Sequence, residues 1–358
     1  MERSNNLAPE VAKFINQTLK RKVSYQLDTL LEGYRLTARS EGKSQNTIDI
    51  VSASIHQLER FYATKELPLD VANIDVMELR QFIVYLQEQP RFAHHPFTPP
   101  QDTPLAGHTV NGYLRGLCAF WAWLTSENFI NDNPFTRLKI PHPPQKVTPI
   151  FTDEQLHRFF GAIDTSSPAG YRDYTMNLTL LDTMVRCSEL TDLRLDNVNL
   201  ENRTLKVRGK GSKERTVPIG AKLQKYLWKY LQFYRPEPAI PRYDQVFLTL
   251  DGHPLTKDRL EAIVKRYGIK AGITGVRVSP HTFRHTSAVM FLRNGGDVFS
   301  LQRILGHSRI ETVGLYVNLA MSDVSRVHRH SSPVDNLELK ISPQHQSNSR
   351  KSSRHQGK

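Results

Sequence analysis

The stretch that says most about this chain is residues 279–285, with the sequence Ser-Pro-His-Thr-Phe-Arg-His. Ser279 is a good N-cap residue and Pro280 suits the first helical position, so we expect a helix to begin here. His281 and Arg284, three residues apart, then lie on one face of that helix. The pair places a proton-transfer group beside a fixed cation whose planar fork can bind two phosphate oxygens. Alone it is a weak signal, because two polar residues often share a solvated helix face.

A second candidate region lies upstream, around Arg186. The apolar spacing there predicts a helix, a short break and another helix, with Arg186 at the break and Glu189 one turn later. Farther along, residues 204–219 have the pattern of two strands joined by a Gly-rich turn that contains Lys210. The sequence therefore predicts a β-hairpin inside a helical region.

A third region follows the 279–285 stretch and contains Gly306-His307 and, nine residues after the histidine, Tyr316. A tyrosine in such an apolar context is usually a core or interface residue, and a histidine after a glycine usually belongs to a helix cap or turn. Neither residue indicates a function by itself. The combination of all three regions is more specific than any one of them.

The composition favours a polyanion as partner. The chain has 358 residues, which exceeds the ~250–300 residues at which single cores usually split, so two domains are expected. Lys and Arg number 48 against 35 Asp and Glu, a net charge of +13. The two cysteines have no CxxC spacing, which argues against a disulfide framework or a thiolate zinc site. No apolar run is long enough to span a membrane and the first residues lack a secretory signal, so we expect a cytoplasmic location.

The pattern of apolar residues predicts a mainly α fold with a small β-hairpin or sheet (α+β), in two domains. Residues 24–140 form a helical domain of three or four blocks, interrupted by an extended Pro-rich loop at 89–105. Residues 141–150 are a Pro-rich linker, and 151–328 form the second domain. Residues 329–358 are a C-terminal tail, expected to be partly disordered.

The candidate residues follow one another along the chain in a particular order: Arg186 with Glu189, then Lys210 in its Gly-Lys-Gly turn, then His281-x-x-Arg284, then Gly306-His307, then Tyr316. In residue type, order and approximate spacing this set resembles the signature of the tyrosine recombinase (phage integrase) family. The resemblance covers nearly all of the predicted folded chain and is strongest from Arg186 onward. Two departures are the Met184-Val185 pair, where the family commonly has Gly-Leu, and the Pro-rich loop, which looks like an insertion.

The resemblance implies a site-specific DNA recombinase or integrase that cuts and rejoins strands through a covalent bond to Tyr316. Tyr316 would attack the scissile phosphate and give a 3′-phosphotyrosyl link with a free 5′-hydroxyl, without metal, ATP or another cofactor. Arg186 and Arg284 would hold the non-bridging oxygens through charge-assisted hydrogen bonds. Glu189 would orient Arg186 through a carboxylate–guanidinium pair.

The remaining catalytic roles implied by the resemblance concern protons and hydrogen bonds. His281 would exchange a proton with Tyr316, whose phenol has an ordinary pKa near ~10. His307 would make a further hydrogen bond to the phosphate, and Lys210 would protonate the leaving 5′ oxygen. The division of labour between the two histidines is left open. His285, about 100° round the helix from Arg284, is interpreted as a packed neighbour.

The resemblance also implies partners. Residues 24–140 would be the family's helical (SAM-like) core-binding domain and 151–328 its catalytic domain, which together would clamp double-stranded DNA that carries specific recombination sites. A homo-tetramer on DNA is expected, with a C-terminal element docked in trans as a hypothesis and accessory proteins left open. The implied location is the nucleoid within the cytoplasm.

Three other functions compete with this one. A type IB topoisomerase shares the chemistry but relaxes supercoils without exchanging partners, and a non-catalytic DNA-binding protein has no use for the tyrosine. A metal-dependent hydrolase would need ligands from among the 14 histidines. The His94-His95 pair and the histidines of the tail lack ligand spacing and carboxylate partners, which disfavours this third function.

Overall fold

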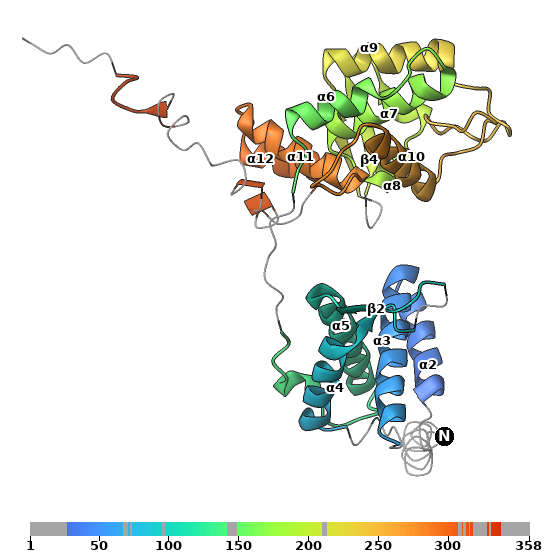
Figure 1. Cartoon of the computed structure of the whole chain (residues 1–358), viewed down its shortest axis with the longest axis vertical. Helices are drawn as coiled ribbons and strands as arrows, with labels where there is room; N and C mark the ends of the chain where they lie inside the picture. The colour runs from blue at the N-terminus through green and yellow to red at the C-terminus, as the bar shows by residue number, and fades with distance from the viewer. Residues whose placement is uncertain are drawn as a thin grey trace, which may run out of the picture. The chain divides into compact units, whose positions relative to one another are not determined.

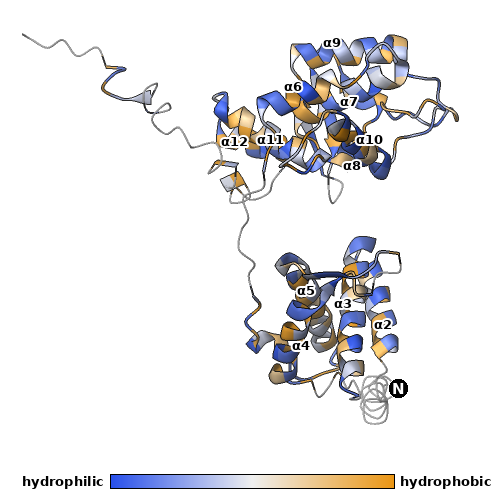
Figure 2. Ribbon diagram, in the orientation of Figure 1, coloured by the Kyte–Doolittle hydropathy of each residue, from blue (hydrophilic) through white to orange (hydrophobic). Residues whose placement is uncertain are grey.

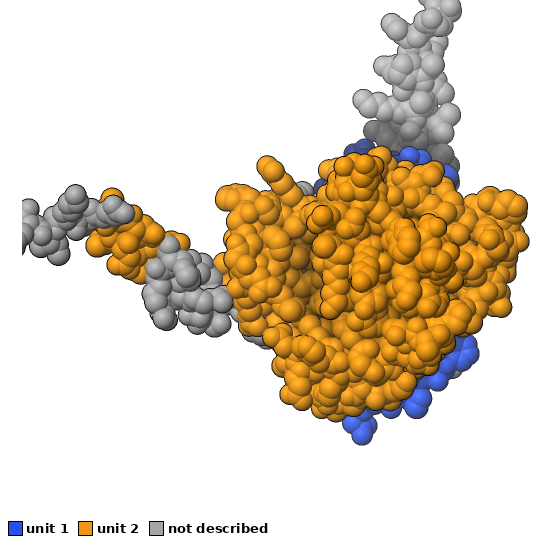
Figure 3. Space-filling model, turned by 90° about the horizontal axis from the view of Figure 1, so that it is seen from above, with its two compact units in different colours: residues 1–146 blue, residues 147–358 orange. Residues whose placement is uncertain are grey.

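The computed structural model describes most of the chain between its two ends. The described residues are 27–66, 71, 74–94, 97–141, 149–209, 213–306, 310, 313–314, 316–317, 328 and 331–337. Lys210 and His307 lie outside them, as do most of residues 141–150 and of the tail at 329–358. The chain divides into two compact units, residues 1–146 and 147–358 (Figures 1 and 3).

In the described part of unit 1, four α-helices pack their apolar faces on one another. They are α2 (Leu27–Ser40), α3 (Gln45–Thr64), α4 (Val76–Glu88) and α5 (Gly107–Ser126), followed by a 3-10 turn, η1 (Pro134–Arg137). Ser44 caps α3 by accepting from the backbone N–H of Thr47. Asp75 and Glu78 make a capping box at the start of α4. The core is rich in aromatic rings, among them Tyr34, Phe82, Phe120 and Trp121.

The Pro-rich segment of unit 1 differs from its prediction as an extended loop. Two short strands, β1 (Pro90–Arg91) and β2 (Gln101–Pro104), pair antiparallel, with Pro90 opposite Pro104 and a bulge before Arg91. Each strand has its proline at one end, where the missing N–H does not interrupt a longer ladder. The loop prediction was therefore wrong for these six residues.

Unit 2 combines helices with a small sheet, one face of which is exposed. The helices are α6 (Asp153–Gly161), α7 (Pro168–Thr183), α8 (Cys187–Thr191), α9 (Ala221–Lys229), α10 (Lys257–Lys270), α11 (Pro280–Arg293) and α12 (Val298–Leu305), with the short turns η2 (Leu195–Asn197) and η4 (Tyr230–Tyr234). The sheet is β3 (Val198–Asn199), β4 (Thr204–Arg208) and β5 (Glu214–Pro218), antiparallel throughout, in the order β3-β4-β5. The predicted hairpin is β4–β5. The prediction of a mainly helical fold with a small sheet is confirmed.

Helix α11 passes through the middle of unit 2. Phe283 is fully buried and its ring centroid lies 5.0 Å from those of both Phe151 and Phe159. The hydroxyl of Thr286, on the same helix, accepts a hydrogen bond from the backbone N–H of Phe151. These contacts fix the helix that carries His281 and Arg284.

Apolar and polar residues alternate around the helices of both units, as expected for amphipathic helices that cover a core (Figure 2). Within the described ranges, no helix is both long and apolar enough to cross a membrane.

Candidate active site

The first turn of α11 presents His281 and Arg284 as the sequence predicts. Ser279 accepts a hydrogen bond from the backbone N–H of Thr282, and Pro280 occupies the first turn. Arg284 is only 4% exposed, and its guanidinium donates to two backbone carbonyls, those of Met184 and Leu305, the latter over 2.8 Å. Burial lowers the pKa of Arg284 to about 10, with the charge of Arg186 acting in the same direction. The side chain is thus rigidly held.

Arg186 lies at the break between α7 and α8. Helix α7 ends at Thr183, and its C-cap residue, Met184, has the left-handed conformation (φ 55°, ψ 22°) that favours glycine. The Met184 side chain is nevertheless buried, in one cluster with Leu305 and Tyr316. Arg186 then starts α8: its backbone N–H donates to Glu189 Oε2 over 2.8 Å and its Nη1 to Glu189 Oε1 over 2.7 Å.

Glu189 also binds a second arginine, which belongs to the β4–β5 hairpin. Arg215, on β5, donates Nη1 to Glu189 Oε1 over 2.7 Å and Nη2 to Oε2 over 2.8 Å. Burial raises the pKa of Glu189, but hydrogen bonds from Arg215 and Arg186 outweigh it and hold that pKa at about 2. Arg215 therefore faces the interior of unit 2.

His285 takes part in the site, although the sequence interpretation set it aside as a packed neighbour. Its Nε2 lies 2.8 Å from Nε2 of His281, so one of the two nitrogens donates a hydrogen bond to the other. The His285 ring also packs on Tyr316, with ring centroids 5.3 Å apart. The signal was present in the sequence: residues 281 and 285 are four apart on a helix and share a face.

Tyr316 is 4% exposed and packs in the cluster that joins α11 and α12. Burial raises the pKa of its phenol, while the charges of Arg284 and Arg186 and a hydrogen bond from Arg284 lower it in part. The phenol therefore stays protonated at neutral pH, so any use of Tyr316 as a nucleophile needs a proton acceptor. Burial, together with the charges of Arg284 and Arg277, lowers the pKa of His281, which favours the neutral imidazole that can accept a proton.

One cavity brings these side chains together. Arg186, His281, Arg284 and Tyr316 all line a space of about 610 Å³ in unit 2. Other lining residues are Lys257, Glu261 and Arg277. Cations outnumber the single carboxylate, so the cavity suits an anion such as a phosphodiester.

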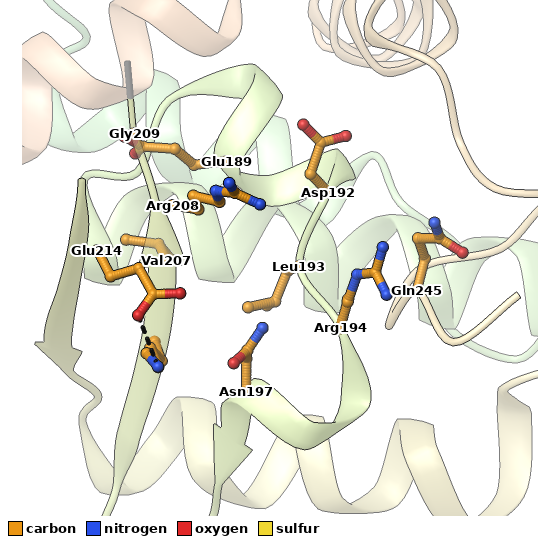
Figure 4. Close-up of a pocket in the computed structure, with 11 residues that line it drawn as sticks. Glu189, Asp192, Leu193, Arg194, Asn197, Val207, Arg208, Gly209, Glu214 and Gln245 are labelled. Carbon is orange, nitrogen blue, oxygen red and sulfur yellow. Dashed lines mark ion pairs between the residues drawn. The ribbon is translucent and has the colours of Figure 1, made fainter. Parts of the chain in front are cut away.

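A second cavity, of about 570 Å³, lies beside the β4–β5 hairpin (Figure 4). Glu189 and Arg208 line one side of it, and Arg194 and Gln245 the other. An ion pair between Glu214 and Lys206 forms part of its wall. Charges of both signs are mixed here, so the space has no preference for an anion.

The two remaining predicted residues, Lys210 and His307, lie outside the described residues, but their neighbours are placed. Gly209 closes β4 by donating its N–H to the carbonyl of Lys213 over 2.8 Å. Gly306 ends α12 in the left-handed conformation, with φ 65°. Within the described part of the chain, no cluster of three or more His, Cys, Asp or Glu side chains is arranged to hold a metal ion.

Comparison with known proteins identifies the relatives of this chain. The sequence model of the phage integrase family matches residues 149–323. The tyrosine recombinase XerD of Xanthomonas axonopodis pv. citri (strain 306) is 35% identical over 227 residues, which are 62% of this chain and 74% of that protein. The XerD of Staphylococcus haemolyticus (strain JCSC1435) is 29% identical over 267 residues, 72% of this chain and 90% of its own length.

Two solved structures share the fold. The XerH site-specific recombinase, in a post-cleavage complex with a palindromic difH substrate, superposes with a TM-score of 0.63 at 19% identity and covers 84% of each chain. A lambda integrase dimer bound to a COC′ core site gives a TM-score of 0.62 at 17% identity, over 81% of this chain and 94% of that one.

Proposed function

The chain belongs to the phage integrase family and is a tyrosine recombinase, an enzyme that breaks and rejoins DNA strands; from that premise we propose that it does so at specific sites, through a covalent bond to Tyr316. The observation that carries this proposal is the convergence of Tyr316, His281, Arg186 and Arg284 on one cationic cavity. A phosphodiester that enters this cavity meets a nucleophile, a proton acceptor and two fixed cations at once.

In the proposed first step, Tyr316 Oη forms a bond to the scissile phosphorus and the bond from phosphorus to the 5′ oxygen breaks. The phenolic proton passes to the His281 and His285 pair, whose Nε2 atoms are 2.8 Å apart. The negative charge that grows on the non-bridging oxygens is met by Arg186 and Arg284, which supply compensation without a metal ion. Because one phosphoester replaces another, the bond energy is kept and ATP is not needed.

The second step reverses the first with a different strand. A 5′-hydroxyl attacks the 3′-phosphotyrosyl phosphorus, and Tyr316 leaves and recovers its proton. In this proposal Lys210 protonates the 5′ oxygen that leaves in the first step and takes a proton back from the attacking 5′-hydroxyl in the second, while His307 adds a hydrogen bond to the phosphate. Two described neighbours in the sequence support these roles: a Cβ at Gly209 would lie 3.3 Å from Glu189 Oε1 and 3.8 Å from Arg186 Nη1, and one at Gly306 would lie 2.9 Å from Arg215 Cδ.

The DNA partner follows from the same premise. We assign residues 24–140 to the core-binding domain and 151–328 to the catalytic domain, and propose that both bind the duplex. The net charge of +13 favours such a polyanion. A homo-tetramer on the recombination site, with the C-terminal tail docked on a neighbouring copy, and a nucleoid location complete the proposal.

Recombination itself tests the function. DNA fragments that bind the Tyr316→Phe variant are selected from a random library, and two copies are placed on one supercoiled plasmid. We expect the wild type, with EDTA and without ATP, to delete or invert the segment between the copies, and Tyr316→Phe to do neither. Relaxation of the plasmid without exchange would favour a topoisomerase, and tight binding with no strand cleavage would favour a non-catalytic protein.

A further inference from the structure

Arg215 lies near the active site and makes hydrogen bonds with its whole guanidinium group, yet no step of the proposed reaction uses it. It is 13% exposed, and all three of its donor nitrogens have partners inside unit 2. Nη1 and Nη2 bind both oxygens of Glu189, while Nε donates to the carbonyl of Ile304 over 2.7 Å. One side chain of β5 thus connects α8 with the last turn of α12.

On the α8 side, Arg215 helps to keep the carboxyl group of Glu189 ionised. This carboxylate is 1% exposed and accepts four hydrogen bonds, two from Arg215 and two from Arg186. A buried carboxylate keeps its charge only while it is paired, and loss of one guanidinium would leave burial to raise its pKa. Protonated Glu189 would bind Arg186 less strongly, so the phosphate-binding guanidinium would lose its orientation.

On the α12 side, Arg215 holds the turn that leads to His307. The carbonyl of Ile304 accepts from Arg215, and the next carbonyl, that of Leu305, accepts from Arg284. Carbonyls in the last turn of a helix lack hydrogen-bond donors within the helix, and here the two guanidinium groups supply those donors. A Cβ added at Gly306 would come within 2.9 Å of Arg215 Cδ, which shows how closely the turn packs on this side chain.

We propose that Arg215 is a positioning residue of the recombinase: it holds Glu189 as an ionised partner of Arg186 and fixes the end of α12 on which Arg284 also rests. Both phosphate-binding arginines therefore depend on one residue that does not touch the phosphate. The inference rests on the proposed function, because it assumes that these arginines bind the scissile phosphate.

The pH dependence of strand cleavage separates this role from a general contribution to stability. Besides Arg186 and Arg215, the charged groups on the cavity side of Glu189 are Lys206 and Arg208 from β4, Glu214 from β5, and Asp192 and Arg194 after α8. In the wild type the pKa of Glu189 is about 2, below its ordinary value, so the paired carboxylate is lost only in strong acid. Without Arg215 that pKa rises, so cleavage decreases as the pH falls from about 8 to about 5.

The experiment measures single-turnover formation of the covalent adduct on a nicked substrate, at saturating protein, across this pH range. Arg215→Met is expected to lower the rate constant roughly 100-fold near neutral pH, with a further decrease in acid, while DNA affinity changes less than about threefold. Arg215→Lys keeps the charge but not the fork and is expected to be intermediate. The double variant Arg215→Met with Glu189→Gln is expected to lose the additional acid dependence seen in Arg215→Met, because residue 189 then has no carboxyl group to titrate.

Lys206→Met is the matched control, since it removes a cation of the same hairpin whose partner is the exposed Glu214. It is expected to cleave like the wild type, and thermal unfolding of every variant checks that it folds. Cleavage by Arg215→Met at the wild-type rate over the whole range overturns the inference. So does a loss that does not vary with pH. If the wild type forms no adduct either, the proposed function fails instead.

Discussion

At the residue scale, Arg284 combines a structural and a catalytic task in one guanidinium. Two of its nitrogens are used by the carbonyls of Met184 and Leu305, and its charge acts on the phenol of Tyr316. A lysine carries the same charge but has a single ammonium group that cannot span both carbonyls. Residue 284 must therefore be an arginine because two hydrogen-bond donors are needed at fixed positions, and a positive charge alone is not enough.

We expect Arg284→Lys to slow adduct formation by at least about 1,000-fold, because a planar donor pair in a buried site is lost from the transition state. The free energy of unfolding is expected to fall by about 2–4 kcal/mol, since a buried carbonyl loses its partner. Single-turnover cleavage and denaturant titration measure the two effects. Arg293→Lys, an exposed substitution at the other end of α11, is the control. Near wild-type cleavage by Arg284→Lys would contradict the assigned role.

The sequence and the structure agree best for residues whose partners are close in sequence. His281 and Arg284 share a helix turn, and Glu189 follows Arg186 within one turn, so helical spacing alone brings each pair together. The same rule indicates His285, which lies four residues after His281 and contacts it. Arg215 could not be found by this rule, because it is 26 residues from Glu189 and 89 from Ile304.

At the scale of the elements, the end of α12 shows how a helix terminus is built into the site. Gly306 has φ 65° and lies against Arg215. Gly272, after α10, has nearly the same φ of 61°, but a Cβ added there would meet no atom within 4 Å. An alanine at Gly272 would therefore add only backbone strain, whereas an alanine at Gly306 would add the same strain and also a close contact with Arg215.

Gly272→Ala is expected to lower the free energy of unfolding by about 1 kcal/mol, the cost of a left-handed alanine. Gly306→Ala is expected to lower it by about 2–3 kcal/mol, because the added methyl group also displaces Arg215. Only Gly306→Ala should slow adduct formation. Denaturant titration and single-turnover cleavage of both variants test this, and equal behaviour of the two would contradict the packing argument.

Helix starts were predictable because their signals are local. The Ser279 cap is present where it was predicted, and the capping boxes that start at Asp75 and Thr152 have the three-residue spacing by which the sequence indicates such a box. The strand β3 was not predicted, since two residues show no periodicity. The left-handed residue after α7 was not predicted either, because a glycine would have indicated that conformation but residue 184 is a methionine.

At the scale of the whole molecule, chain length and net charge bear on the domain organisation and on the class of partner. A length of 358 residues indicated two domains, and the structure has two compact units. The excess of Lys and Arg indicated a polyanionic partner, which the comparisons with tyrosine recombinases support. The order of chemically distinct residues along unit 2 carried the identification of the family. The hairpin in residues 89–105 escaped prediction, because its pairing depends on contacts between strands nine residues apart.

The central claim is that Tyr316 forms the covalent bond to DNA. The direct measurement incubates the wild type and Tyr316→Phe with nicked, binding-selected DNA in the presence of EDTA, resolves adducts on a denaturing gel, and locates the DNA-linked peptide by mass spectrometry. The account predicts an adduct from the wild type alone, joined to the peptide that contains Tyr316. An adduct formed by Tyr316→Phe, or one joined to another residue of the wild type, would contradict it.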